Sequence, residues 1–174
     1  MALSQFVKHF EDVALTLADG TATTPLTATG LLDVGDVAIQ GLTPALRELV
    51  KYERKGAFQT ARLGKRVYPT GSFSAQFAEF SEAAVGTFLD MIFKTAGTPY
   101  AAAVSTLGAS AQVDTRNLTI DVEGSDYGDS GDHELVLGHI FFTSVDWSMG
   151  EPASLAFSFE VLGAVSGDLA IAEG

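Results

Sequence analysis

The feature that most constrains the fold is a single change of hydrophobic periodicity, which falls between residues 70 and 99. Residues 72–77 alternate polar and apolar side chains, a period of two that is typical of a β-strand. The apolar residues that follow recur at helical spacing and form one stripe: Val85, Phe88, Leu89, Ile92 and Phe93. Gly97 and Pro99 then signal a stop. The stretch therefore predicts one strand followed by one amphipathic helix over about residues 82–96.

On both sides of this helix the sequence returns to strand patterns. Further alternating or short apolar segments occupy residues 11–17, 26–32, 37–42, 118–122, 135–147 and 154–165. Lys55-Gly56 lies between two extended segments and predicts a hairpin or a long extended loop. With 174 residues, the chain is long enough for one domain with a real core. We therefore predict a single domain over residues 1–174 that is mainly β, a β-sandwich or small barrel with one flanking α-helix.

Composition narrows the classes of function. The formal net charge of −12 argues against a protein that grips nucleic acid, since neutralising phosphates requires clustered Lys and Arg. The chain has no cysteine, so disulfides and thiolate chemistry are excluded. No stretch approaches the roughly 20 uninterrupted apolar residues of a membrane span, and the N-terminus lacks the apolar core of a secretory signal. We expect no membrane insertion, and an intracellular location is the default.

Positive charge is concentrated in one segment. Residues 47–66 contain seven basic and two acidic residues, a local charge of +5, whereas the rest of the chain has three basic and twenty acidic residues, or −17. The seven basic residues are Arg47, Lys51, Arg54, Lys55, Arg62, Lys65 and Arg66. A solvated basic loop has this pattern. So does one pole of a self-complementary contact, in which the basic loop of one copy meets an acidic surface of another.

No motif in the chain indicates catalysis or nucleotide binding: a G-x-S-x-G elbow and phosphate-cradling glycine loops are both missing. The histidines are His9, His133 and His139. Six positions separate the last two, so an unbroken strand would place both on one face, near Asp132 and Glu134. A divalent-metal site is one interpretation, and ordinary polar residues at a loop–strand junction are the other. H-E-x-x-H is absent and no third ligand is suitably spaced, so we expect no metal, cofactor or catalytic residue.

Three aspartates recur at every third position within the hydrophilic segment 124–134, namely Asp126, Asp129 and Asp132. They invite comparison with an EF-hand loop that starts at Asp121. In that register, however, Asp126 occupies the position that requires glycine, and Asp132 replaces the terminal glutamate. The sequence thus favours a solvated acidic loop over a calcium site, and this loop is also a possible counterpart of the basic segment.

The order of these features resembles the tail tube (major tail) protein of long-tailed bacteriophages and of related gene-transfer particles. The stretches that carry the resemblance are VALTLADGTATTPLTATGLLDVGDVAIQGL, RELVKYERKGAFQTARLGKR, VYPTGSFSAQFAEFSEAAVGTFLDMI and LAFSFEVLGAV, which together span most of the chain. The resemblance implies a β-sandwich with one flanking helix, six copies joined in a ring, and rings stacked into a hollow tube. DNA would pass through this tube without specific binding, and the tape-measure and tail-end proteins would be the other partners.

The resemblance also implies a location and interaction residues. The protein would be made in the cytoplasm of the host bacterium and reside in the tail of the virion, without enzyme activity. In the family, a long loop between early strands reaches the adjacent ring. By position this loop matches residues 43–66, so the seven basic residues become candidates for stacking contacts. Family tubes often have an acidic lumen along which DNA slides, which makes Asp121 and Glu123 lumen candidates.

Alternative functions remain at this point. Another tail or neck component, or the tube protein of a related injection machine, would share the same fold. A calcium- or carbohydrate-binding β-sandwich module would use the aspartate-containing segment instead. An enzyme has the least support from the residues.

Overall fold

The structure is a computed structural model that describes residues 13–31, 34–42, 46–77, 83–122, 133–148 and 153–167. Its elements, in chain order, are β1 (Val13–Ala18), β2 (Thr27–Leu31), β3 (Val34–Gln40), β4 (Arg47–Arg54), β5 (Ala57–Arg66), β6 (Thr70–Phe77), α1 (Ala83–Phe93), the 3-10 helix η1 (Pro99–Ala102), β7 (Arg116–Val122), β8 (His133–Ser148), β9 (Ala153–Val161) and β10 (Val165–Ser166).

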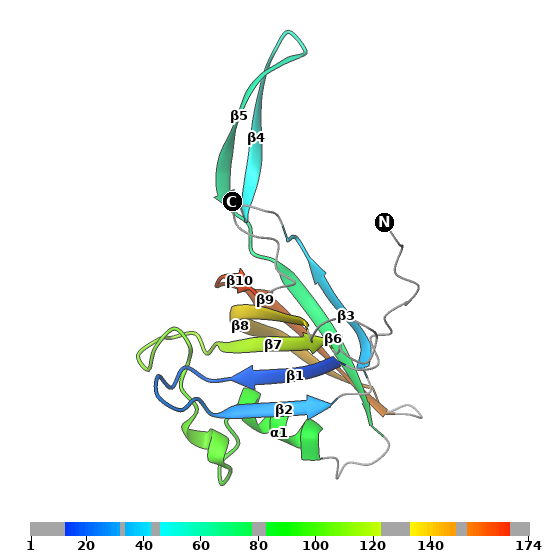
Figure 1. The fold of residues 1–174 in the computed structure, drawn as a ribbon, viewed down its shortest axis with the longest axis vertical. Helices are drawn as coiled ribbons and strands as arrows, with labels where there is room; N and C mark the ends of the chain where they lie inside the picture. The colour runs from blue at the N-terminus through cyan, green and yellow to red at the C-terminus, as the bar shows by residue number, and fades with distance from the viewer. Residues whose placement is uncertain are drawn as a thin grey trace.

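Eight strands form one hydrogen-bonded sheet in the order β2-β1-β7-β8-β9-β6-β3, with β10 paired to β8. The sixteen-residue strand β8 joins its two halves: residues 133–140 pair with β7, and residues 140–148 pair with β9. In Figure 1, β1, β2 and β7 run across the body while β3 and β6 run steeply down it, so the two halves of the sheet lie at an angle to each other. The predicted mainly β fold with one flanking helix is confirmed, in the form of a sheet that folds over its own core.

A bulge in the middle of β8 produces the change of direction. Leu118 pairs with Leu137, but Arg116 pairs with Ile140, so β8 contains one extra residue between these pairs. His139 adopts a φ of 51° there, and its backbone N–H donates to Asn117 Oδ1 at 3.1 Å. Because of this bulge, β8 is not the regular, unbroken strand on which His133 and His139 would share one face. His139 lies within the bulge, where its Nδ1 is 2.8 Å from Thr106 Oγ1.

Aromatic side chains fill the space between the sheet halves and the helix. Phe73 on β6 stacks on Phe157 at a centroid distance of 4.7 Å and meets Phe88 of α1 edge to face at 6.4 Å. Leu15, Leu17, Leu118, Leu137 and Met91 are fully buried in the same cluster. Helix α1 thereby covers apolar sheet surface that would otherwise contact water, which explains why one helix suffices.

Helix α1 ends at Phe93, three residues before the predicted boundary. Lys94 adopts a φ of 50°, and the N–H of Thr95 donates to the carbonyl of Asp90 at 3.1 Å, the hydrogen bond of a Schellman C-cap. Arg116 on β7 also reaches this end of the helix, where its Nη2 donates to the Met91 carbonyl at 3.1 Å. A guanidinium near the helix C-terminus is stabilised by the helix dipole.

Replacing Phe73 by leucine should lower the free energy of unfolding by about 1–2 kcal/mol, because the ring contacts are lost while most of the volume is retained. Chemical denaturation would measure the change. The matched control is Phe58→Leu on the exposed surface of β5, which should alter stability by less than about 0.5 kcal/mol. Equal effects of the two substitutions would contradict this assignment of the core.

Candidate interaction surface

Strands β4 and β5 form a separate two-stranded sheet that projects from the body, by which we mean the described residues outside these two strands (Figure 1). At about 3.3 Å per residue, the eight and ten residues of the strands extend roughly 26 and 33 Å. The turn is formed by Lys55 and Gly56, whose φ values of 52° and 74° match a type I′ turn. The predicted hairpin is thus confirmed, and glycine suits its second turn position.

The base of the hairpin is fixed to the body. Arg66 Nη2 donates to the Gly163 carbonyl at 2.8 Å, and its guanidinium lies over the ring of Tyr68 at 5.6 Å. Leu46 is buried beside the start of β4, and its carbonyl accepts a hydrogen bond from the Val67 N–H at 2.8 Å. Of the seven basic residues, Arg66 therefore has an evident structural role within the chain.

All seven basic residues of the hairpin are exposed. Arg47 and Arg66 face each other at the base, while Arg54 and Lys55 lie at the tip. Arg62 lies over the ring of Tyr52 at 5.4 Å, a cation–π contact. Across the described ranges, the ion pairs of the structure involve Asp114 with Lys94 and with Arg116, and none of these seven residues. The structure brings the predicted stacking residues together on one projecting element, where their charge is available to a partner.

Sequence reasoning missed a second property of the hairpin, namely that exposed apolar side chains gather on one of its faces, called the apolar face below. Leu49 pairs directly with Leu63, Lys51 with Ala61, and Glu53 with Phe58, so these side chains share one face, on which Lys51 and Glu53 are the charged residues. Leu49, Phe58 and Leu63 are 59%, 63% and 53% exposed. The opposite face carries Val50, Tyr52, Arg54 and Arg62 by the same register. An isolated two-stranded ribbon is marginally stable in water, and exposed apolar residues along it indicate a surface made for contact.

The lumen candidates lie on the body or outside the described residues. Asp121 is on β7, where it pairs with Ala14 on one side and Glu134 on the other. Its neighbours Leu118 and Ile120 are buried, so the alternation places Asp121 on the outer face of this half of the sheet. Glu123 lies outside the described residues, as do Asp126, Asp129 and Asp132 of the aspartate segment.

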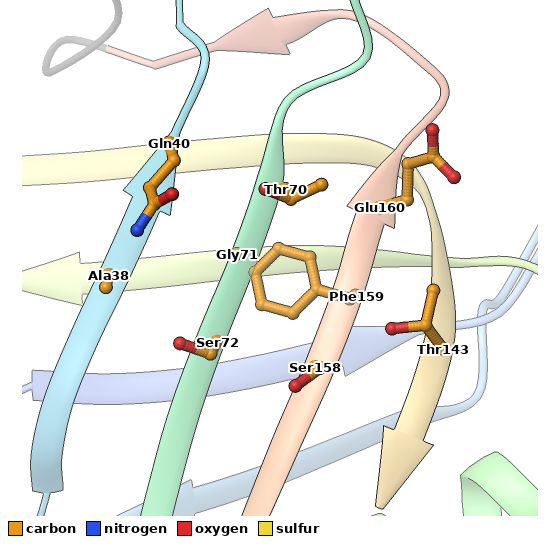
Figure 2. A pocket seen from close by; sticks show the side chains of 9 residues that line it. All are labelled: Ala38, Gln40, Thr70, Gly71, Ser72, Thr143, Ser158, Phe159 and Glu160. Atoms are coloured by element: carbon orange, nitrogen blue, oxygen red, sulfur yellow. The ribbon is translucent and has the colours of Figure 1, made fainter.

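The outer face of the other half of the sheet is polar and slightly hollowed. A shallow pocket of about 360 Å³ lies on β3, β6, β8 and β9. Figure 2 shows the residues that line it: Ala38, Gln40, Thr70, Gly71, Ser72, Thr143, Ser158, Phe159 and Glu160. Hydroxyl and amide groups dominate this lining, and Glu160 is its charged residue. The ring of Phe159 covers Gly71, where a Cβ atom would come within 2.3 Å of it. Small polar groups therefore make up most of the lining of this face.

Two further findings concern other classes of site. In the described ranges, no three His, Asp or Glu side chains are grouped in a way that could hold a metal ion. Across those same ranges, no helix has the length and apolar character needed to cross a membrane.

Comparison of the fold with solved structures gives distant but nearly complete matches. The sheath–tube complex of the PVC extracellular contractile injection system, in its extended state, contains a chain that matches with a TM-score of 0.56 at 10% identity, covering 94% of this chain and 93% of that one. The fold of this protein is tail-tube-like. No family model matches the sequence, and a search of curated proteins finds no match.

Two other components of injection systems share this tail-tube-like fold. A chain of the PVC sheath/tube terminator in the extended state matches with a TM-score of 0.53 at 13% identity, over 95% of this chain and 99% of that one. A chain of the anti-feeding prophage baseplate matches with a TM-score of 0.51 at 6% identity, over 98% and 99% of the two chains. In each case the match extends over most of the length of both chains.

Proposed function

We propose that this chain is a structural, non-enzymatic subunit of a phage-type tail tube, in which hexameric rings stack into a hollow conduit for DNA. The observation that carries the proposal is the projecting hairpin: its apolar face is exposed, and its basic residues other than Arg66, which is anchored to Gly163, form no ion pair within the described ranges. The tail-tube-like fold supports it, because chains with this fold occur in the sheath–tube complex of an injection system.

Free strand edges support lateral joining into rings. Among the described residues, β3 pairs with β6 alone, and residues 141–146 of β8 pair with β9 alone. These two edges border the same half of the sheet, β8-β9-β6-β3. Unpaired backbone groups at an edge are templates for another strand, so β3 of one copy can continue the sheet of a neighbour at β8. Repetition of that contact would close a ring.

Acidic and hydroxyl-bearing outer faces support passage of DNA without retention. We keep Asp121, and Glu123 beyond the described residues, as lumen candidates. The face in Figure 2 is a second candidate, since its lining lacks Lys and Arg. Either surface would repel phosphates or leave them unbound, because attachment to the DNA backbone depends on cations.

A second candidate function is a tube terminator or baseplate component, because chains from such assemblies share the fold. Polymer length distinguishes the two. A tube protein forms long polymers of variable length, whereas a terminator forms single rings. Electron microscopy and light scattering of the pure protein at high concentration would decide between them, and a protein that remains monomeric would contradict both.

Reversing the charge at the hairpin tip by Arg54→Glu and Lys55→Glu is expected to reduce the polymerised fraction at least about tenfold, since like charges at a contact cost several kcal/mol. Both side chains are exposed, so circular dichroism should show an unchanged monomer fold. The matched control keeps the charge through Arg54→Lys and Lys55→Arg and should polymerise normally. Tubes of normal yield from the reversed variant would refute the stacking role of the tip.

A further inference from the structure

The face of the hairpin opposite its apolar face differs from it in chemistry, and we call it the basic face. By the strand register it consists of Val50, Tyr52, Arg54, Ala57, Thr60 and Arg62. The carboxylate of Glu53 belongs to the apolar face, and Glu48 lies nearer the base, beside Gly64. Over the described residues 50–62, the basic face therefore presents guanidinium and hydroxyl groups and no carboxylate.

Two guanidinium groups of this face are available to an anion. Arg54 and Arg62 are both exposed, and across the described ranges neither takes part in an ion pair. Arg62 lies over the ring of Tyr52 at 5.4 Å, a contact that restricts the plane of the guanidinium before any ligand arrives. Tyr52 is itself 41% exposed and contributes a hydroxyl donor. Guanidinium and phenolic donors of this kind bind the phosphate oxygens of nucleic acids.

The length of the hairpin determines whether a polyanion can approach a chain whose net charge is −12. The eight residues of β4 extend roughly 26 Å from the base of the hairpin. The Debye length is about 10 Å at 0.1 M salt, so the tip lies roughly two Debye lengths or more from the acidic body and its repulsion is largely screened there. The local charge of +5 then dominates the field at the tip.

The shape of the hairpin favours double-stranded DNA among polyanions. The major groove is about 12 Å wide and admits a two-stranded β-ribbon. Strands β4 and β5 form such a ribbon, separate from the main sheet and projecting from the body (Figure 1). Lys55 and Gly56 close it in a two-residue turn, which keeps the tip narrow and adds a third cation beside Arg54.

We propose that the basic face binds the backbone of double-stranded DNA, with the ribbon along the major groove and Arg54, Lys55 and Arg62 on phosphates. The contact is independent of base sequence, because phosphate contacts position a protein without reading bases. This inference rests on the proposed tube function, which brings DNA to the assembly. Hairpins between stacked rings are covered by neighbouring copies, whereas those of one terminal ring stay free. DNA is thus retained at that end of the tube and slides along the rest of the bore.

Fluorescence anisotropy with a labelled duplex of about 20 base pairs tests this contact on the unmodified chain, diluted until light scattering detects no polymer. We expect binding at about 50 mM salt. The logarithm of the binding constant should fall with the logarithm of salt concentration by about 0.9 for each phosphate contacted, or about 2.7 for three. Arg62→Glu should weaken binding at least about tenfold and reduce this slope to about 1.8.

The matched control is Lys51→Glu, which makes the same change of charge on the opposite face of the same ribbon. It should keep the slope of about 2.7, because Lys51 contacts no phosphate in the proposed arrangement. Equal losses of slope from the two substitutions would overturn the basic face as the site, since only total charge would then matter. Absence of duplex binding at about 50 mM salt would overturn it as well.

Two further ligands distinguish duplex DNA from other anions. Single-stranded DNA of the same length should bind more weakly than the duplex, and equal binding would overturn the placement in the groove. Vesicles that contain phosphatidylglycerol should bind more weakly than the duplex, and tighter binding to them would assign the face to a membrane surface instead.

Electron microscopy of the concentrated protein separates this inference from the tube function. Tubes formed by a chain that does not bind duplex DNA when dilute would overturn the inference and leave the tube function in place. A chain that binds duplex DNA through Arg62 but forms no polymer would remove the tube function and keep the basic face as a DNA-binding surface.

Discussion

Replacing residues 48–65 by a short Gly-Ser linker is expected to abolish tube formation while the body stays folded. The change removes the exposed side chains of β4 and β5, including the Leu49–Leu63 pair and five of the seven basic residues. It retains buried Leu46 and the hydrogen bond from Arg66 to Gly163, so the base of the hairpin is preserved. Because the excised ribbon buries almost nothing in the single chain, its loss has little effect on stability there.

Thermal melting and light scattering would measure the two parts of this result separately. We expect a melting temperature within a few degrees of that of the unmodified chain and no polymer at any concentration at which the unmodified chain forms tubes. The matched control is Gln59→Ala at the exposed bulge of β5, which leaves both faces of the hairpin in place and should polymerise. Tubes formed by the excised variant would show that stacking does not depend on the hairpin, and the proposed function would lose its main support.

Replacing Asp19 by alanine is expected to cost about 4 kcal/mol of folding stability. The carboxylate is 3% exposed, and it accepts hydrogen bonds from the backbone N–H groups of Thr21, Leu26 and Val104 at 3.2, 2.8 and 3.0 Å and from the Thr21 hydroxyl at 2.7 Å. This one side chain ties the end of β1 to the start of β2 and to the segment after η1. Alanine would leave these N–H donors without their acceptor.

The Asp19 carboxylate also makes the free energy of unfolding depend on pH. Burial acts to raise the pKa of Asp19, but the hydrogen bonds from Val104, Thr21 and Leu26 outweigh it, so the pKa lies below its ordinary value of 3.8. A carboxyl group with a lowered pKa stabilises the fold above its unfolded-state value, and this contribution is lost as the pH falls below about 4 towards the folded-state value. Asp19→Asn should therefore remove part of the acid-dependent loss of stability.

Urea denaturation between pH 2.5 and pH 7 would show this effect. The unmodified chain should lose stability more steeply below pH 4 than Asp19→Asn, which starts from a lower plateau at neutral pH. Asp146→Asn is the control, because Asp146 is exposed and accepts a single side-chain hydrogen bond, from Ser144 at 2.9 Å. Parallel pH profiles for all three proteins would exclude Asp19 as the source of the acid sensitivity.

The sequence was sufficient for the type and order of the main elements, because these depend on local patterns. The alternation around Phe73 and the 3.6-residue spacing of Phe88 and Leu89 identified β6 and α1. Lys55-Gly56 identified the hairpin turn, since few residues other than glycine adopt its backbone angles readily. The clustered positive charge marked residues 47–66 as a candidate contact segment, but it did not reveal that one face of the hairpin carries exposed apolar side chains.

What the sequence did not reveal depends on bulges, which shift the register without changing the local pattern. Counting back from the turn in a regular hairpin places Leu49 opposite Arg62 and puts Leu63 on the other face. A register shift near Gln59 moves Leu63 opposite Leu49, and it thereby creates the apolar face. The bulge at His139 acts in the same way on β8: side chains after the bulge lie on the opposite face from the one that regular alternation would give them. Pairing energies across the sheet, and not the residues at these positions alone, select such bulges.

The anchoring of Arg66 has a mechanical consequence. Its guanidinium holds the carbonyl of Gly163, whose own N–H donates to the Gly138 carbonyl at 2.9 Å, next to the irregular point where the long strand turns from one partner to the next. A lateral force on the hairpin would therefore be transmitted through Arg66 and Gly163 to the bulge in β8, and not directly to the aromatic core.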